Sequence, residues 1–318
     1  MPLSLIVSRK AVEAEGICSL ELRAPDGAPL PPFTAGAHID LHLPGGVVRP
    51  YSLCNDPADT RRYQIAVLRE AASRGGSAAV HELLHEGERV YVGAPRNLFA
   101  LDEGARSHLL LAGGIGITPL LAMAERLRTI GADFQLHHAT RSLARTPFRA
   151  RLAAAPYAHR VHHHLDDGDA AQRLDLARLL ASPEPGRHLY VCGPQGFMQA
   201  VLAQAAAAGW ADDHVHTESF GAAPCAVAGD QAFDVLLSRS GRVVAVPAGR
   251  SVVQALADAG VVVATSCEQG VCGTCLTRVI DGVPAHRDQY LTPEEQAAND
   301  QFLPCCSRSQ SARLVLDL

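Results

Sequence analysis

Three cysteines in the last quarter of the chain constrain its fold more than any other feature. Cys267, Cys272 and Cys275 follow the spacing C-x4-C-x2-C, and a fourth cysteine lies farther along, at Cys305 or Cys306. This spacing is typical of the plant-type [2Fe–2S] cluster, in which four thiolates bind two irons. A short loop must then wrap three thiolates around one side of the cluster. The sequence therefore predicts an iron–sulfur site.

Two glycines inside this loop, Gly270 and Gly273, support the prediction. Glycine adopts positive φ and allows close backbone approach at little cost, and N–H groups aimed at the sulfurs help to set the reduction potential. A zinc site is one alternative, but structural zinc sites usually pair two such units, and the sequence has no second CxxC unit. A redox-active Cys272–Cys275 pair is another alternative, which would not need Cys267.

The size and charge of the chain exclude several classes of protein. Its 318 residues, 47% of them apolar, are enough for two or three domains with cores of their own. The net charge of −5 argues against a basic face for nucleic acid or an anionic membrane. No apolar run approaches the length of a transmembrane helix, and the first residues do not resemble a signal peptide. Single cysteines at Cys18, Cys54, Cys192 and Cys225 favour a reducing, cytoplasmic location.

Residue patterns divide the chain into three domains. Residues 1–102 alternate apolar and polar positions between closely spaced turns, which is typical of a small antiparallel β-barrel or sandwich. Residues 103–225 alternate strands with helices, which predicts an α/β domain with a parallel sheet. A small-residue linker over 221–230 precedes residues 226–318, which carry the cysteine loop. The fold class is therefore multidomain, with a β-barrel, an α/β domain and a small C-terminal domain.

Individual elements can be placed from apolar periodicity, caps and turns. We expect helices over residues 78–84, 118–130, 174–180, 194–208 and 251–260. We expect strands over residues 108–112, 134–139, 161–165, 188–192, 233–237, 242–246, 276–280 and 314–318, and a further strand that ends near Glu218.

Two weak motifs in the first domain indicate an anion site. Arg49, Tyr51 and Ser52 form an R-x-Y-S sequence, and Arg74-Gly75-Gly76-Ser77 precedes a predicted helix. Two glycines and a hydroxyl at a helix N-terminus present N–H groups to a phosphate, and Arg49 can add a charge-assisted contact. The alternative is a surface arginine beside a half-buried tyrosine.

Two glycine turns in the second domain indicate a nucleotide site. Gly113-Gly114-Ile115-Gly116 leads into Thr118-Pro119, and Cys192-Gly193-Pro194 repeats the same strand–turn–helix order. Neither turn has the G-x-G-x-x-G fingerprint, but ligands of parallel sheets collect at the carboxyl ends of strands, where both turns lie. The alternative is that the glycines serve packing alone.

Taken together, these motifs resemble the phthalate dioxygenase reductase and vanillate demethylase reductase family over essentially the whole chain. The resemblance implies an FMN-binding barrel over residues 1–102, an NAD-binding domain over 103–225 and a plant-type ferredoxin of β-grasp fold over 226–318. It also implies that Cys305 is the fourth ligand, because the family pattern C-x-S-R places Cys306 at the variable position.

The resemblance further implies a role for each motif residue. Ser52 would lie near flavin N5, Phe220 would cover the flavin face, and Glu218 would lie close by. The implied catalytic residues are Ser52, Thr118, Cys192, Glu218 and Phe220. The implied cofactor-binding residues are Arg49, Tyr51, Ser52, Ala66, Val67, Leu68, Gly75, Gly76, Ser77, Gly114, Gly116, Thr118, Cys192, Gly193 and Phe220. The implied cluster ligands are Cys267, Cys272, Cys275 and Cys305.

Some features leave the cofactors open. Pro50 lacks an N–H group, so FAD is an alternative to the FMN that the Gly-Gly-Ser loop favours. The acidic pair Asp166–Asp167 favours NADH over NADPH, whereas Arg141 and Arg145 would suit a 2′-phosphate. In the run 162–164, only the first and third histidines share a face of a strand, and no third metal ligand accompanies them, so we expect no metal there.

The three implied domains and their cofactors together imply an electron-transfer reaction. NADH delivers two electrons to a flavin, and a [2Fe–2S] cluster accepts one at a time. Plant-type clusters lie near about −400 mV and Rieske centres start at about −150 mV, so transfer to a Rieske-type oxygenase acting on an aromatic acid is downhill. Contact with this partner would be transient. Alternative functions are a reductase for another acceptor such as a heme protein, a zinc-binding module and a redox sensor.

Overall fold

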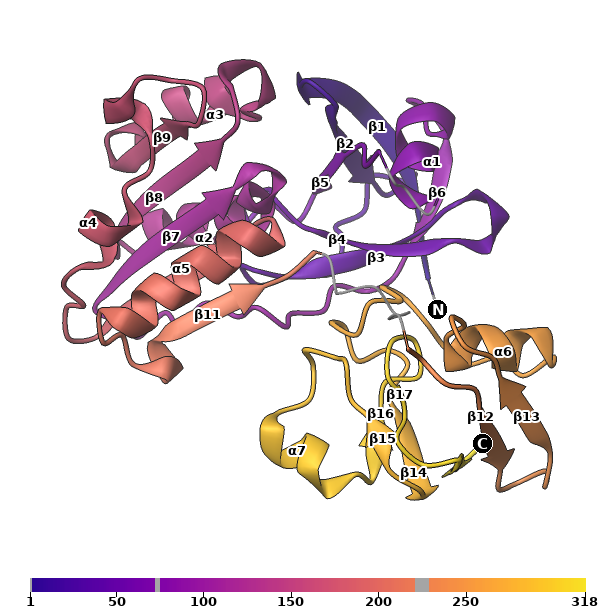
Figure 1. Ribbon diagram of the computed structural model, residues 1–318. Coiled ribbons are helices and arrows are strands. Elements are labelled where there is room, and N and C mark those ends of the chain that lie inside the picture. The colour runs from indigo at the N-terminus through magenta and orange to yellow at the C-terminus, as the bar shows by residue number, and fades with distance from the viewer. Residues whose placement is uncertain (1, 72–74, 221–228) are drawn as a thin grey trace. The chain divides into compact units, whose positions relative to one another are not determined.

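The computed structural model describes residues 2–71, 75–220 and 229–318 (Figure 1). The chain forms two compact units, Met1–Phe220 and Gly221–Leu318. The predicted boundary between residues 102 and 103 falls inside the first unit, whose two parts share one hydrophobic core, and it stays a prediction. Several predicted features lie outside the described residues. They are Arg74, Cys225, most of the predicted linker, and the predicted boundary between residues 225 and 226.

The first part of unit 1 is a six-stranded antiparallel sheet in the order β4-β3-β6-β1-β2-β5. Its strands supply much of one hydrophobic core, six consecutive residues of β2 are buried, and the longest strands form the hairpin of β1 and β2. Strands β4 and β5 are the first and last strands of this order, and both carry predicted flavin residues. The strands are β1 (Leu3–Ala14), β2 (Ile17–Arg23), β3 (His38–His42), β4 (Val48–Ser52), β5 (Tyr63–Leu68) and β6 (Arg89–Val92).

Helix α1 (Gly76–Leu83) is fixed at both ends by specific residues. Gly75 precedes it with φ of 88°, a conformation that glycine adopts at little cost. The only lysine of the chain, Lys10 on β1, closes the other end of the helix. Its Nζ donates hydrogen bonds of 3.0, 2.7 and 2.7 Å to the carbonyl oxygens of Val80, His81 and Leu84. A cation at a helix C-terminus complements the helix dipole, so Lys10 ties α1 to the barrel.

The second part of unit 1 is a five-stranded parallel sheet in the order β11-β10-β7-β8-β9 (Figure 1). Helix α2 belongs to the core on one face, and α4 and α5 belong to the core on the other. The carboxyl ends of the neighbouring strands β7 and β10 therefore lie at one edge. The elements are β7 (Ser107–Gly113), α2 (Ile117–Thr129), β8 (Asp133–Thr140), α3 (Arg149–Ala154), β9 (Val161–Leu165), α4 (Leu176–Leu180), β10 (Arg187–Cys192), α5 (Gln195–Ala207) and β11 (Val215–Glu218).

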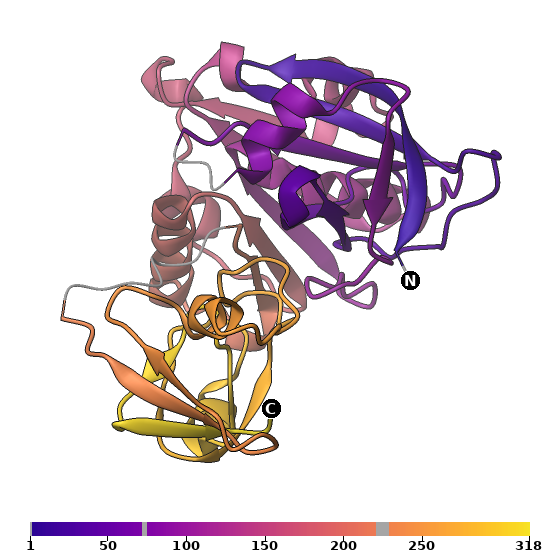
Figure 2. The same ribbon diagram turned by 90° about the vertical axis from the view of Figure 1, so that its right-hand side faces the viewer.

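Unit 2 is a mixed five-stranded sheet, β13-β12-β18-β14-β16, with a two-stranded sheet β15-β17 (Figures 1 and 2). Helix α6 packs on the larger sheet through Val252 and Leu256, which share a core with Val235 and Leu314. The elements are β12 (Phe233–Leu237), β13 (Val243–Val246), α6 (Val252–Asp258), β14 (Thr277–Asp281), β15 (Pro284–Ala285), α7 (Pro293–Ala298), β16 (Gln301–Phe302), β17 (Arg308–Ser309) and β18 (Arg313–Leu316).

The predicted elements are present, with ends that differ by at most two residues, and the fold class is confirmed. Helices α3 and α7 were not predicted. Helix α7 follows a capping box, in which Thr292 N donates to Glu295 Oε2 at 2.8 Å and Glu295 N donates to Thr292 Oγ1 at 3.2 Å. That T-x-x-E signal was available in the sequence. Helix α3 gives no such signal, because it follows Phe148 in a left-handed conformation, with φ of 61°. Across the described ranges, no helix has the length and apolar character needed to cross a bilayer.

Candidate functional site

The four predicted cluster ligands come together in unit 2. Cys267, Cys272, Cys275 and Cys305 are 3%, 9%, 3% and 3% exposed. Thiol contacts join Cys267 to Cys272 and to Cys305, and join Cys275 to Cys305. Hydrogen bonds with these neighbouring thiols lower the pKa of Cys267 and Cys275 and raise the pKa of Cys272 and Cys305. The sulfurs thus form one continuous series of contacts, Cys272–Cys267–Cys305–Cys275.

This donor set fits a binuclear cluster. A [2Fe–2S] cluster binds four cysteine sulfurs, two at each iron, so the four sulfurs need not surround a single metal ion. In the part of the chain that the structure describes, no three His, Cys, Asp or Glu side chains are grouped around one metal ion. Four buried thiols in contact with one another are donors that suit a cluster of two irons.

The adjacent cysteine, Cys306, is directed differently. Its Sγ lies 3.7 Å from Leu303 O and 3.7 Å from Ser307 Oγ. It also lies against Gly270, where a Cβ atom would collide with it. Of the four predicted ligands, Cys305 is the one that Cys306 contacts. The geometry therefore favours Cys305 over Cys306 as the fourth ligand.

Both loop glycines have the predicted positive φ, 74° at Gly270 and 69° at Gly273. A Cβ at Gly273 would collide with the ring of Tyr290, which packs over the loop. Sequence reasoning missed Tyr290, and its spacing from the cysteines gives no signal. The N–H of Gln269 donates to Cys267 Sγ at 3.3 Å, so backbone donors do reach a ligand sulfur.

The two weak motifs of the barrel lie together. A Cβ on Gly76 would be 2.6 Å from Arg49 Cγ, so the arginine of R-x-Y-S packs directly on the first residue of α1. Tyr51 is half-buried on β4, and burial raises its pKa. Ser77 Oγ accepts a hydrogen bond of 3.1 Å from Glu70 N. A charged group thus adjoins the helix N-terminus, which fits the phosphate of a flavin mononucleotide.

A second group of predicted residues meets where the barrel adjoins the parallel sheet. Ser52 Oγ donates to Glu218 Oε2 at 3.1 Å, although 166 positions separate the two residues. Cys192 pairs with Glu218 across β10 and β11 and is fully buried. Burial raises the pKa of Cys192, as does the nearby Glu218 charge. Part of the Glu218 residue reaches solvent, but its carboxyl group lies deep in the protein. Burial raises the pKa of Glu218 to about 8, and the hydrogen bond from Ser52 opposes this shift.

The two glycine turns of the α/β part touch each other. A Cβ on Gly116 would lie 2.7 Å from Gly193 N and would collide with the Cys192 carbonyl. Gly114 has φ of 54°, and Thr118 Oγ1 donates to Ile115 O at 3.1 Å. The two turns therefore lie together at the N-termini of α2 and α5, where N–H groups can receive an anion. The nucleotide site that they indicate stays a prediction.

One buried histidine that supports the first turn was missed. The His138 ring contacts Gly114 O through Nε2 at 2.9 Å, and burial lowers the pKa of His138 to about 4. The neutral ring therefore donates to this carbonyl and holds the turn in place. Nothing in the sequence around position 138 separates this histidine from an ordinary core residue.

The other predicted residues are placed as follows. Ala66, Val67 and Leu68 lie on β5, where Val67 O contacts His81 Nε2 at 2.9 Å. Phe220 lies two residues beyond β11 and is 39% exposed. Asp166 N donates to Thr140 O at 3.0 Å and Asp167 N donates to Arg141 O at 3.2 Å, which brings the acidic pair beside the end of β8. Arg145 forms an ion pair of 2.8 Å with Glu15.

His162 and His164 do share a face, and His137 on β8 joins them. The His137 ring stacks on both, at centroid distances of 4.6 and 5.2 Å, and its Nδ1 lies 2.9 Å from His164 Nε2. Burial lowers the pKa of His137 to about 3. These three rings form a packed group.

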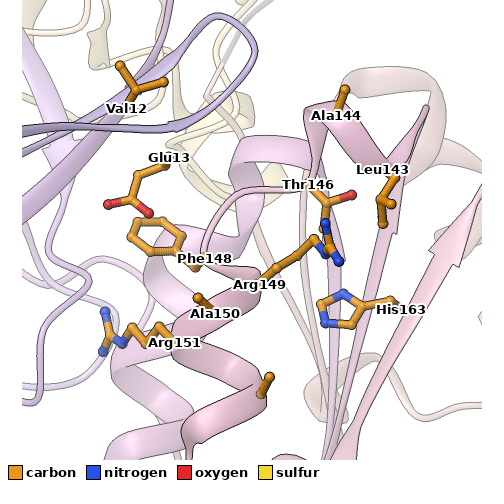
Figure 3. Close-up of a pocket in the computed structure, with 11 residues that line it drawn as sticks. Val12, Glu13, Leu143, Ala144, Thr146, Phe148, Arg149, Ala150, Arg151 and His163 are labelled. Carbon is orange, nitrogen blue, oxygen red and sulfur yellow. The ribbon is translucent and has the colours of Figure 1, made fainter.

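A cavity of about 710 Å³ lies between β1 and the segment around α3 (Figure 3). The ring of Phe148 points toward Glu13, while Arg149 and His163 lie on the other side. Arg151 borders the cavity and joins the two parts of unit 1, because it donates to Cys54 O at 2.8 Å and pairs with Glu125 at 3.4 Å. None of the predicted site residues lines this cavity.

Comparisons with known proteins match both units. The family model "2Fe-2S iron-sulfur cluster binding domain" matches residues 235–310, and "Dimethylamine monooxygenase subunit DmmA-like, N-terminal domain" matches residues 94–215. The vanillate O-demethylase oxidoreductase of Pseudomonas putida is 54% identical over 99% of this chain and 99% of its own length.

Two solved structures match the whole chain. The phthalate dioxygenase reductase structure, described as modular for electron transfer from pyridine nucleotides to [2Fe–2S], is 43% identical, with a TM-score of 0.80, and the match covers 100% of this chain and 98% of that one. An intact type IV self-sufficient cytochrome P450 monooxygenase is 40% identical, with a TM-score of 0.82, and the match covers 100% of this chain and 41% of that one.

Proposed function

Since the chain belongs to the phthalate dioxygenase reductase family, we propose that it passes electrons from NADH through FMN and a [2Fe–2S] cluster to a Rieske-type oxygenase that acts on an aromatic acid. It is an oxidoreductase that serves an oxygenase component. The observation that carries the proposal is the group of four buried cysteine sulfurs in a unit separate from the flavin and nucleotide residues. We also propose that contact with the oxygenase is transient, and that the cysteines of the described residues, none of which forms a disulfide, reflect a reducing, cytoplasmic location.

The residues that hold the cofactors follow from the contacts described above. Arg49, with Gly75, Gly76 and Ser77 at the start of α1, would hold the FMN phosphate. Gly114, Gly116, Thr118 and Gly193 would receive the nucleotide at the edge of the parallel sheet. Cys267, Cys272, Cys275 and Cys305 would bind the irons. When bound, the flavin accepts a hydride and releases electrons singly, and the cluster accepts one electron at a time.

Glu218 and Ser52 give the protein control of a proton at this site. Because its pKa is raised to about 8, the Glu218 carboxyl is mostly protonated at pH 7. Ser52 Oγ lies 3.1 Å from Glu218 Oε2 and belongs to the strand that also carries Tyr51. This pair can store a proton and pass it between the Glu218 carboxyl group and Ser52 Oγ, beside the buried Cys192.

The absorption spectrum of the purified protein before and after NADH tests the proposal. We expect combined flavin and iron–sulfur bands that bleach together, with two irons and two sulfides per chain. A colourless protein with zinc would overturn it, as would a cluster that NADH does not reduce. Phe220→Ala should leave FMN bound but change the rate of hydride transfer or of oxygen reduction, and unchanged rates for both would remove its role.

A heme protein is the second candidate acceptor. It is favoured over a zinc-binding module or a redox sensor by the match to a self-sufficient cytochrome P450, in which a chain of this fold accompanies a monooxygenase. Reconstitution separates the two acceptors. The reduced protein should support turnover of a Rieske-type oxygenase, and should reduce a P450 heme domain much more slowly.

A further inference from the structure

Glu268, directly after the first loop cysteine, has a backbone conformation that is unusual for its residue type. Its φ is 55°, and among the described residues only Phe148 and Asn299 also combine positive φ with a side chain. Asparagine tolerates this region, whereas glutamate has no feature that favours it. Strained backbone of this kind persists where the surrounding structure demands it, and it is concentrated at functional sites.

This conformation turns the following peptide group back toward the cysteine before it. The N–H of Gln269 thereby reaches Cys267 Sγ, with an N···S distance of 3.3 Å. The loop is held there because Gln289 N donates to Gly270 O at 3.0 Å. A hydrogen bond to a ligand sulfur stabilises the additional negative charge of a reduced cluster, so it raises the reduction potential.

The side chain of Glu268 acts in the opposite direction. It is the only charged residue between Thr265 and Leu276, and the residue is half-buried. A carboxylate beside the ligands repels an added electron, and this repulsion is stronger where protein replaces water. Through its backbone, Glu268 thus directs a donor at a sulfur, and its side chain carries a negative charge one position after that cysteine in the sequence.

We propose that Glu268 is a positioning residue that sets the reduction potential of the cluster. Its left-handed backbone directs the Gln269 N–H at Cys267, and its carboxylate holds the potential below the value that the N–H donors alone would give. The proposal rests on the function proposed above, in which Cys267 is a cluster ligand.

Redox titration of the full chain, loaded with FMN and cluster, tests the charge. The reduced cluster is followed by its electron paramagnetic resonance signal. We expect Glu268→Gln to raise the ratio of reduced to oxidised cluster about threefold at a fixed potential, which is about 30 mV at roughly 59 mV per tenfold. The matched control is Asp281→Asn, which removes the same charge from an exposed residue at the far end of β14. Equal ratios for the two variants would overturn the charge effect.

Two further variants test the backbone. Glu268→Gly keeps the left-handed conformation without strain, so it should show the potential of Glu268→Gln and retain iron at least as well. Glu268→Val places a β-branched residue where such residues fit worst, and should lose iron severalfold faster to a chelator. Asn299 has the same left-handed conformation at the C-terminal cap of α7. Asn299→Gly should therefore change neither the reduction potential nor the rate of iron loss.

The outcomes separate this inference from the proposed function. A wild-type protein without iron would mean that the proposed function fails. A wild-type protein with a normal cluster would leave that function standing, and the inference would then fail if Glu268→Val kept both its iron and the potential of Glu268→Gln.

Discussion

The cysteine loop and the flavin–nucleotide region are built in different ways. Three of the four proposed cluster cysteines lie within nine consecutive residues, and this loop contains two glycines with positive φ. The Ser52–Glu218 contact instead joins positions 166 residues apart, from two differently folded parts of unit 1. In a local motif, the spacing of residues in the sequence brings the reactive groups together. In a distributed site, these groups meet only after the strands have paired. Variants of one region should therefore leave the chemistry of the other intact.

The largest effect should come from the adjacent cysteines of the cluster site. Cys305→Ser removes a sulfur that contacts Cys267 and Cys275, and changes outside the ligand set already cost about 10–100-fold in metal affinity. We expect a loss of iron per chain of more than about 100-fold, measured by metal analysis, with hydride transfer to the flavin unchanged. Cys306→Ser is the matched control and should keep its iron. The ligand assignment is wrong if the two variants exchange these results.

The next largest effect should come from the distributed site. Ser52→Ala and Glu218→Gln each remove half of a hydrogen-bonded pair that handles a proton, and such groups contribute about 10²–10⁴-fold to rates. We expect hydride transfer, followed by stopped-flow absorbance, to slow about 100-fold while iron and FMN contents stay normal. Ser8→Ala removes a hydroxyl from β1, whose Oγ donates to Glu21 O, and should leave the rate unchanged. A loss of iron in Ser52→Ala would contradict the independence of the two regions.

The contact between the two parts of unit 1 should matter to stability. Arg151 donates to Cys54 O and pairs with Glu125, and hydrogen bonds of charged groups contribute about 1.5–3 kcal/mol each. We expect Arg151→Met to lower the free energy of unfolding of unit 1 by about 2–3 kcal/mol, measured by urea titration with flavin fluorescence. Arg145→Met removes an exposed ion pair with Glu15, which should cost under about 1 kcal/mol. Equal losses would show that Arg151 does not tie the two parts together.

The smallest effect should be a pH dependence specific to unit 1. The Glu218 pKa is raised from 4.5 to about 8 in the folded chain, so between these values the folded chain binds more protons than the unfolded chain. Its stability relative to Glu218→Gln should therefore fall as the pH rises from about 4.5 to about 8. Because part of the Glu218 residue reaches solvent, which weakens the effect, we expect a difference of about 1–2 kcal/mol. Unfolding measured at pH 5 and pH 8.5 checks it, and parallel curves would contradict the raised pKa.

The same contrast explains what could be predicted from the sequence. Cysteine spacing and glycine turns are local, so the cluster loop, the fold class and the alternation of strands and helices could be inferred directly. The Ser52–Glu218 bond, the His138 support of Gly114 and the Tyr290 ring over Gly273 depend on which strands and loops become neighbours, and no residue pattern encodes that. Helix α7 is different, because its capping box at Thr292 could have been recognised.

The hydrogen bonds of Lys10 have a practical consequence. Its ammonium group is the only side-chain primary amine of the chain, and all three of its protons are donated to the last turn of α1. A reagent that acylates amines can attack this nitrogen only after the helix end has released it. The rate of side-chain acylation therefore reports how often that end of α1 opens, and a bound phosphate at the other end should slow the labelling.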